Sequence, residues 1–398
     1  MSTFACHPSM GSEAGVGWAW LKEMSKYNNV WALVWDGQGQ IDALKKAIEI
    51  DKIKSVTIVP IYVPDLLHEH FRKFAYALWN IKALMVAKKL HKKINFDIIH
   101  KTTIAAWWDV GYLYKLNIPY IWGPISGAQR IPLSMFGFIS IKERVKEIIR
   151  SILLEIGWNF RSNFRKAARS ANYVFAANPE TENKLKAFLR KVKVVALNEV
   201  GSFKCSNKIE TEHETVELLW CGNSEYRKNF GLCVEALRNV STKIPWHLTV
   251  VGGGARLEAY KNYVQHLGIA SKISFVGKIP YNEMGDLYSK ADIFLFTSLR
   301  EATGTVLIEA MSYGVVPISL EIHGARIVID KQCGMLIPAQ DKDETIQKYT
   351  EAIKFLIENK EVRNEMARNA IKRIEENFLW DKRGILMHSF YQKVLNCQ

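Results

Sequence analysis

One stretch of the sequence decides the fold: Ser298-Leu-Arg-Glu301-Ala-Thr-Gly304-Thr305-Val306-Leu-Ile-Glu309-Ala-Met-Ser-Tyr-Gly314-Val-Val-Pro317. We expect an apolar strand to end just before it, a glycine loop to follow, and a helix to begin near Thr305. Another apolar run, residues 316–319, begins directly after that helix. A strand, a glycine loop and a helix that lead to another strand are typical of a parallel α/β sheet.

The same alternation of short apolar runs and helical patterns extends over the whole chain, with a break after residue 197. It predicts strands at 3–7, 30–35, 55–60, 97–100, 119–122, 173–176, 193–196, 216–221, 247–251, 273–276, 293–297 and 316–319. We therefore expect an α/β protein with two Rossmann-like, doubly wound domains that face an interdomain cleft. The expected domains are residues 1–197 and 198–376, followed by a C-terminal helix over 377–398.

The composition is that of an ordinary globular protein. Of the 398 residues, 48% are hydrophobic and 24% are charged, which excludes disorder, collagen and coiled coil. We expect no signal peptide and no membrane span. The six cysteines are scattered without a C-x-x-C pair, and the ten histidines lack metal-ligand spacing. These patterns predict reduced thiols, a cytoplasmic location and no metal site.

The net charge is concentrated in the first half of the chain. Residues 1–200 contain 29 lysines and arginines against 16 acidic residues, whereas residues 201–398 contain 25 against 24. This asymmetry indicates an anionic partner for the first half: a membrane surface, a phosphate-bearing substrate or nucleic acid. We expect no nucleic-acid partner, because the aromatic residues do not interleave with basic ones in a known motif.

The loop after residue 297 predicts an anion site. Free N–H groups of Gly304, Thr305 and Val306 at a helix start would bind a phosphate. Glu301 and Glu309 flank this position, and carboxylates accept hydrogen bonds from the hydroxyls of a sugar or a ribose. The alternative is that Glu301 caps the helix and Glu309 is a surface residue.

A second strand, residues 216–221, leads into Gly222 and then into a basic pair. Arg227 and Lys228 would neutralise a diphosphate leaving group. The alternative is a solvated basic turn.

Two candidates lie in the first half of the chain. The loop with Gly11 and Ser12 follows the first expected strand and opens a helix, so it would supply backbone donors that close over the reactants. The alternative is a helix start that packs closely on the sheet. His100 ends the fourth expected strand at the edge of the cleft, although a lone histidine there is more often structural.

These motifs together resemble the retaining glycosyltransferases of family 4, which have the GT-B fold. The resemblance rests on Glu301 and Glu309 with seven residues between them, on Gly222 followed by Arg227 and Lys228, and on the Gly11–Ser12 loop. It also includes the residues at 122–125 and 378–380, and it covers nearly the whole chain. This chain has asparagine at position 223, where the family often has arginine.

The resemblance implies a role for each motif. Catalytic residues would be Glu301 on the donor sugar, His100 near the transferred sugar, and Lys228 with Arg227 on the diphosphate. The substrate-binding residues would be Gly11, Ser12, Gly222, Gly304, Thr305, Val306 and Glu309, the last on the ribose. Residues 1–197 would be the acceptor side and 198–376 the nucleotide-sugar side, and the final helix would cross back to the first domain. The implied chemistry needs no cofactor and no metal.

We therefore expect a retaining glycosyltransferase that moves a sugar from a nucleotide-diphosphate donor to a saccharide or polyprenyl-linked saccharide. Its expected pathway is bacterial surface polysaccharide synthesis (O-antigen, capsule or exopolysaccharide). The alternatives are a soluble sugar synthase or nucleotide-sugar epimerase of the same fold, and a non-catalytic protein that binds sugar nucleotides.

Two amphipathic basic stretches, residues 68–93 and 141–169, suggest an anionic membrane surface as a further partner. Apolar residues recur at helical spacing in both, and Lys142, Lys146 and Arg150 form a basic stripe. Such helices lie on an anionic leaflet. We therefore expect peripheral association with the inner face of the cell membrane. The alternative is that each apolar stripe packs against the protein core.

Overall fold

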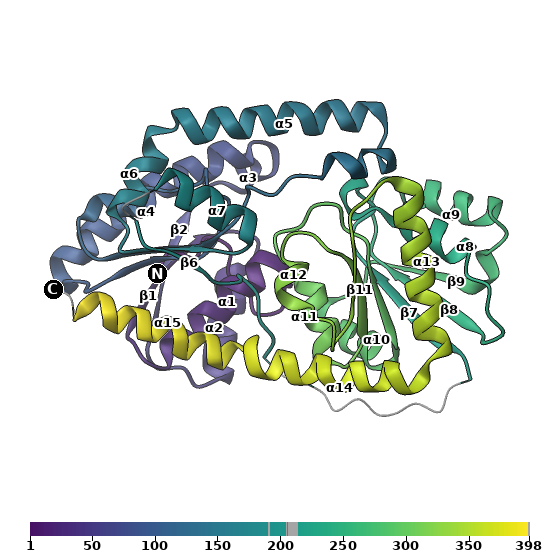
Figure 1. The fold of residues 1–398 in the computed structure, drawn as a ribbon. Coiled ribbons are helices and arrows are strands. Elements are labelled where there is room, and N and C mark those ends of the chain that lie inside the picture. The colour runs from purple at the N-terminus through teal and green to yellow at the C-terminus, as the bar shows by residue number, and fades with distance from the viewer. Residues whose placement is uncertain (190–191, 204, 206–213, 397–398) are drawn as a thin grey trace. The chain divides into compact units, whose positions relative to one another are not determined.

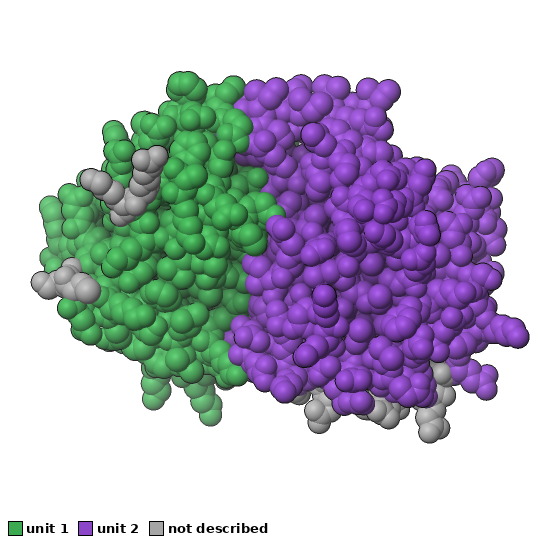
Figure 2. Space-filling model, in the orientation of Figure 1, with its two compact units in different colours: residues 1–128, 155–201, 380–398 green, residues 129–154, 202–379 purple. Residues whose placement is uncertain are grey.

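The computed structural model describes residues 1–189, 192–203, 205 and 214–396, and it divides the chain into two compact units (Figure 2). Unit 1 comprises residues 1–128, 155–201 and 380–398, and unit 2 comprises 129–154 and 202–379. Residues 397 and 398, the end of the expected C-terminal helix, lie outside the described residues. Each unit contains parallel strands connected through helices, which confirms the predicted α/β class with two Rossmann-like domains.

Unit 1 is built on parallel strands that the first residues of the chain hold together (Figure 1). Ser2 bridges to Leu33 on one side and to Lys101 on the other, so residues 2–4 lie between β1 and β3 where a longer strand was expected. The strands are β1 (Val30–Asp36), β2 (Val56–Tyr62), β3 (Ile99–Lys101), β4 (Tyr120–Ile125), β5 (Tyr173–Ala176) and β6 (Val194–Ala196). The helices are α1 (Ser12–Ser25), α2 (Gln40–Ile50), α3 (Asp65–His70), α4 (Arg72–Ile94), α6 (Ser162–Ser170), α7 (Pro179–Phe188) and α15 (Trp380–Leu395).

Unit 2 has a six-stranded parallel sheet in the order β12-β11-β10-β7-β8-β9. Its strands are β7 (Val216–Cys221), β8 (Trp246–Val251), β9 (Ile273–Gly277), β10 (Ile293–Phe296), β11 (Val316–Leu320) and β12 (Met335–Ile337). Its helices are α8 (Phe230–Arg238), α9 (Leu257–His266), α10 (Met284–Lys290), α11 (Thr305–Ser312), α12 (Ala325–Val328), α13 (Lys342–Glu358) and α14 (Lys360–Asn377). The sequence pattern missed β12, although it predicted strands at the equally short β3 and β6.

The structure corrects the expected domain division at residues 129–154, which group with unit 2. The cause is hydrophobic: Ile131, Met135 and Ile139 belong to the same buried cluster as the strands of unit 2. Ser134 adds a 2.8 Å hydrogen bond from its hydroxyl to the carbonyl of Ala339. A stretch from the first half of the sequence therefore completes the core of the second unit.

Helix α5 (Ile141–Phe160) buries two of its acidic residues and exposes most of its apolar residues. Glu143 and Glu147 are buried, with Glu147 accepting hydrogen bonds from the Tyr226 hydroxyl at 2.6 Å and from Arg300 at 3.2 Å. Leu154 and Trp158 are buried as well, but the other large apolar residues are exposed: Ile141, Val145, Ile148, Ile149, Ile152, Leu153, Ile156 and Phe160. The alternative that this stripe packs against the core is therefore wrong for the described chain.

Both amphipathic stretches are also interrupted. The first divides into α3 and α4 at Phe71, and the second divides into α5 and α6 at Arg161. Helix α4 buries Tyr76 and Trp79, while the expected stripe residues Phe71, Phe74, Ile81 and Met85 are exposed. In the part of the chain that is described, no helix has the length and apolarity needed to cross a bilayer.

Candidate functional site

The strand order of unit 2 places two loops of the sequence motif side by side. Strand β7 pairs with β8 on one edge and with β10 on the other, so the chain turns in opposite directions after β7 and after β10. Ligands of open parallel sheets bind beyond the carboxyl ends of the strands at such a switch point. Arg227 and Lys228 follow β7, and Glu301 follows β10. The topology therefore predicts that these three side chains meet.

The side chains do meet, on one carboxylate oxygen. Oε2 of Glu301 accepts a hydrogen bond from Nη1 of Arg227 at 3.1 Å and another from Nζ of Lys228. The backbone fixes both loops, since the N–H of Leu299 donates to the carbonyl of Arg227 at 2.7 Å. In addition, the Thr297 hydroxyl donates to the carbonyl of Lys228 at 2.8 Å. The two basic residues and the acid thus form a single preorganised cluster.

The electrostatics of this cluster keep Glu301 ionised. Burial by itself raises the pKa of Glu301, but the charges of Lys228 and Arg227 outweigh burial and hold the pKa below its ordinary value. The side chains of Glu301 and Lys228 remain 22% and 13% exposed, so a ligand can reach both. Arg227 also pairs with Glu225, whose Oε2 lies 2.7 Å from Nε of Arg227, so two cations and two carboxylates meet at the switch point.

The start of α11 adds backbone donors to the same loop. Gly304, which precedes the helix, has φ 92, and a Cβ there would lie 2.6 Å from the Phe296 ring, so glycine is required. Among the described residues, the N–H groups of Thr305 and Val306 have no protein acceptor, as expected for the first turn of a helix. These donors and the positive end of the helix dipole can bind an anion.

Glu309 and Gly222 complete the part of the site in unit 2. The carboxylate of Glu309 accepts hydrogen bonds from the hydroxyls of Tyr281 at 2.7 Å and Tyr288 at 2.9 Å, and burial raises the pKa of Glu309. The sequence analysis missed both tyrosines because nothing in a linear pattern pairs them with this acid. Gly222 directly follows β7, and its N–H donates to the carbonyl of Val251 at 2.9 Å. Gly222 is therefore held at the carboxyl end of the sheet.

In unit 1, the Gly11–Ser12 loop opens α1 at the carboxyl end of the sheet. Ser12 is exposed and has φ 58, an unusual conformation for a residue with a side chain. Further along the helix, Gly17 permits close packing, because a Cβ there would lie 2.0 Å from the Ala5 carbonyl oxygen. Close packing on the sheet therefore explains Gly17, while Gly11 and Ser12 remain accessible.

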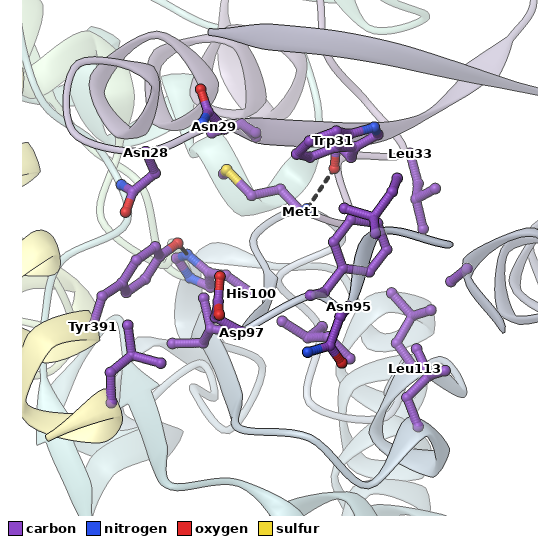
Figure 3. Close-up of a pocket in the computed structure, with 18 residues that line it drawn as sticks. Met1, Asn28, Asn29, Trp31, Leu33, Asn95, Asp97, His100, Leu113 and Tyr391 are labelled. Atoms are coloured by element: carbon purple, nitrogen blue, oxygen red, sulfur yellow. Dashed lines mark hydrogen bonds between the residues drawn. The ribbon is translucent and has the colours of Figure 1, made fainter. Parts of the chain in front are cut away.

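His100 is not placed as predicted. It is buried, its Nδ1 lies 2.7 Å from the Tyr391 hydroxyl, and its Nε2 lies 2.8 Å from the carbonyl oxygen of Gly123. Burial lowers its pKa to about 3, so the ring is neutral at physiological pH. Figure 3 shows His100 beside Tyr391 in a pocket that also includes Asp97, before β3, at the amino ends of the strands. A catalytic His100 is therefore not supported, and its role is to join α15 to the sheet.

The arrangement in unit 2 suits a ligand that carries both phosphate and hydroxyl groups. Lys228, Arg227 and the open amides of α11 can hold a diphosphate. Glu301 and Glu309 can accept hydrogen bonds from hydroxyls on either side of it.

Comparison with known sequences points to the same region of the chain. Residues 204–373 match the family Glycosyl transferases group 1. Similar curated proteins include a D-inositol 3-phosphate glycosyltransferase of Corynebacterium diphtheriae, 27% identical over 35% of this chain and 32% of the relative. Another is an N-acetyl-alpha-D-glucosaminyl L-malate synthase of Bacillus anthracis, 28% identical over 41% of each chain. The aligned region thus spans about a third to two fifths of these relatives.

Solved structures extend the likeness to both units. The fold is similar to that of sucrose-phosphate synthase from Thermosynechococcus elongatus, with TM-score 0.67, 16% identity and coverage of 100% of this chain and 98% of that chain. It is also similar to Anabaena HepE in complex with UDP and glucose, with TM-score 0.63, 15% identity and coverage of 97% and 98%. These comparisons confirm the expected GT-B fold and the resemblance to glycosyltransferases.

Proposed function

Given the match of residues 204–373 to the group 1 glycosyltransferases, we propose that this protein transfers a sugar from a nucleoside diphosphate sugar to an acceptor hydroxyl. One observation carries the proposal: Glu301, Lys228 and Arg227 meet at the switch point of unit 2, beside the open amides of α11. This cluster supplies cations for a diphosphate and a carboxylate for a sugar within one loop pair.

Each group at the site has a role in the proposed reaction. Lys228 and Arg227 stabilise the charge that grows on the departing diphosphate, together with the N–H groups of Thr305 and Val306. Glu301 accepts hydrogen bonds from the donor sugar, and Glu309 accepts them from the ribose while its two tyrosines orient it. A solved protein of the same fold that holds UDP and glucose supports a donor of this class.

The proposed reaction proceeds with retention and without a metal or cofactor. The bond between the anomeric carbon and the phosphate oxygen breaks, and the electron pair leaves with the nucleoside diphosphate. The acceptor oxygen forms its bond to the anomeric carbon on the same face of the sugar. The acceptor's proton passes to the departing phosphate oxygen, so no separate base is needed. His100 takes no part in this scheme.

We further propose a saccharide or polyprenyl-linked saccharide as acceptor, in bacterial surface polysaccharide synthesis at the cytoplasmic face of the membrane. Two observations support peripheral membrane association: the exposed apolar residues of α5 and α4, and the excess of basic residues in the first half of the chain. An apolar face flanked by cations is the pattern of a helix that lies in an anionic interface.

The test of the donor proposal begins with a thermal-shift screen of nucleoside diphosphates. Nucleotide sugars of the base that binds are then assayed for release of nucleoside diphosphate, with wild type compared with Glu301→Ala. We expect the variant to lose at least about a hundredfold in rate, because it removes a contact to the donor sugar and takes away the carboxylate that positions Lys228. Glu258→Ala, an exposed acid on α9, is the matched control and should keep full activity.

The products distinguish the other interpretations. Release of an epimerised sugar identifies an epimerase, and binding without release identifies a non-catalytic protein. Unchanged turnover in Glu301→Ala contradicts the role proposed for that residue.

A further inference from the structure

Unit 1 contains a polar cavity of about 370 Å³ that the donor site does not use. Helix α4, the loop after β3 and the junction of α5 with α6 line it, with Lys73, Asn80, Asp109, Phe160, Arg161 and Asn163 among the residues at its surface. The loop after β3 extends from the carboxyl end of the sheet, on the side where open α/β sheets bind ligands. The volume lies within the usual range of about 300–1,000 Å³ for small-ligand sites.

The cavity combines two cations with one carboxylate. Lys73 and Arg161 supply the positive charge, and the described residues provide no ion-pair partner for either of them. Asp109 also has no side-chain partner within the described chain. Burial raises its pKa, while the charges of Lys101, Arg161 and Lys73 act in the opposite direction. A ligand with a phosphate for the cations and a hydroxyl for Asp109 would satisfy all three charges.

A packed aromatic cluster holds the cavity in shape. Trp107 stacks on Trp158 with ring centroids 3.9 Å apart, and both rings contact Phe164 edge-on. Nη1 of Arg161 donates a hydrogen bond to the carbonyl of Trp108 at 3.2 Å. The other N–H groups of the guanidinium remain available to a ligand. The hydrogen bond to Trp108 therefore holds Arg161 at the wall of the cavity.

The cavity has an apolar rim. Phe160, which lines it, is 81% exposed, and Ile156, one turn earlier on α5, is 49% exposed. Together with Ile152 and Leu153 these residues continue as an exposed apolar stretch along α5, and contiguous apolar surface of this kind marks an interaction site. Cations inside and an apolar surface at the mouth match a molecule with a phosphate head and a hydrocarbon tail.

We propose that this cavity binds the phosphate-bearing head of a lipid-linked acceptor, with the hydrocarbon chain leaving over Phe160 and Ile156. This inference rests on the proposed transferase function and deepens it by assigning a binding site to the acceptor's phosphate. Lys73 and Arg161 bind the phosphate oxygens, Asp109 accepts a hydrogen bond from a sugar hydroxyl, and the acceptor is thereby held at the membrane surface.

Direct binding tests the proposal without a known donor. Farnesyl diphosphate, inorganic pyrophosphate and farnesol are titrated into the full chain by calorimetry. We expect Arg161→Gln and Lys73→Gln each to weaken farnesyl diphosphate binding about tenfold, because each removes a charge-assisted hydrogen bond. Phe160→Ser should weaken farnesyl diphosphate binding without changing that of pyrophosphate. Arg169→Gln on α6 and Lys88→Gln on α4 are exposed controls and should change neither.

Each outcome decides the proposal. Equal affinity of wild type and Arg161→Gln for farnesyl diphosphate overturns it. If pyrophosphate binds as tightly as farnesyl diphosphate and Arg161→Gln weakens both, the phosphate source is a free anion and the lipid assignment is wrong. The screen of nucleoside diphosphates tests the transferase function separately. If that function fails, the titration with farnesyl diphosphate still tests whether this cavity binds the lipid phosphate.

Discussion

A single carboxylate oxygen of Glu301 accepts hydrogen bonds from both Lys228 and Arg227. Because this interaction needs the ionised carboxylate, it makes the free energy of unfolding depend on pH. The pKa of Glu301 is lowered in the folded chain. The contribution of Glu301 to the free energy of unfolding is therefore complete above its unfolded pKa and is lost as pH falls through its folded pKa. We expect Glu301→Gln to lower the free energy of unfolding by about 1–2 kcal/mol at pH 7. The difference should disappear as pH falls below the folded pKa of Glu301, as measured by urea unfolding between pH 7 and 3.

The control for this prediction is Glu258→Gln, whose carboxylate is exposed on α9 beside Lys261. Its effect should stay within about 0.5 kcal/mol at every pH, because exposed ion pairs contribute little. A wild-type advantage over Glu301→Gln that stays constant down to pH 3 would sink this electrostatic account.

At the scale of elements, α5 differs from an ordinary amphipathic helix in which of its residues are buried and which are exposed. Glu143 and Glu147 are buried while most of its apolar residues face outward, and these outward residues are the ones that the proposed membrane contact would use. Wild type should float with liposomes of phosphatidylcholine and phosphatidylglycerol at low salt. The triple variant Ile148→Ser, Ile152→Ser, Leu153→Ser should bind about tenfold less, because it removes apolar area that would enter the interface.

The matched control for α5 is the double variant Ile385→Ser, Leu386→Ser, which removes exposed apolar side chains from α15 instead. Its flotation should equal that of wild type. The membrane proposal fails if wild type does not float at low salt, or if the α5 variant floats as well as wild type.

At the scale of the whole molecule, the last helix of the sequence belongs to the first unit. Helix α15 buries Trp380, Met387 and Tyr391 in unit 1, where Trp380 contacts Trp20 edge-on. Truncation after Leu379 removes these side chains, and each large buried residue lost costs about 3–5 kcal/mol. Because whole-domain stability is only about 5–15 kcal/mol, we expect unit 1 to lose its cooperative unfolding transition in calorimetry.

Unit 2 has its own buried cluster, so its transition should survive this truncation, along with any nucleoside diphosphate binding. A chain that ends at Leu395 keeps all of α15 and serves as the control. Two unchanged transitions after truncation at Leu379 would show that α15 does not support unit 1.

Much of the fold and part of the site could be predicted from the sequence, because short stretches of neighbouring residues carry the signals for both. Apolar runs fix strands such as β7 and β10, and Gly304 before Thr305 fixes a helix start. Because parallel strands end at one edge of a sheet, the sequence also predicted that Glu301 would share a site with Lys228. His100 could not be predicted correctly, because a strand's last residue faces either the ligand or the core, and the pattern of residues 97–100 is the same in both cases.

The sequence by itself determined the α/β alternation, the loops that carry Glu301, Arg227 and Lys228, and the basic character of the first half. Only the tertiary structure decided which face of α5 is buried, that residues 129–154 complete unit 2, and that Tyr391 holds His100. The physical reason is that hydrogen-bond propensity and hydrophobic period act between near neighbours in the chain. Burial depends on partners that may lie a hundred or more residues away, as Glu147 and Arg300 do.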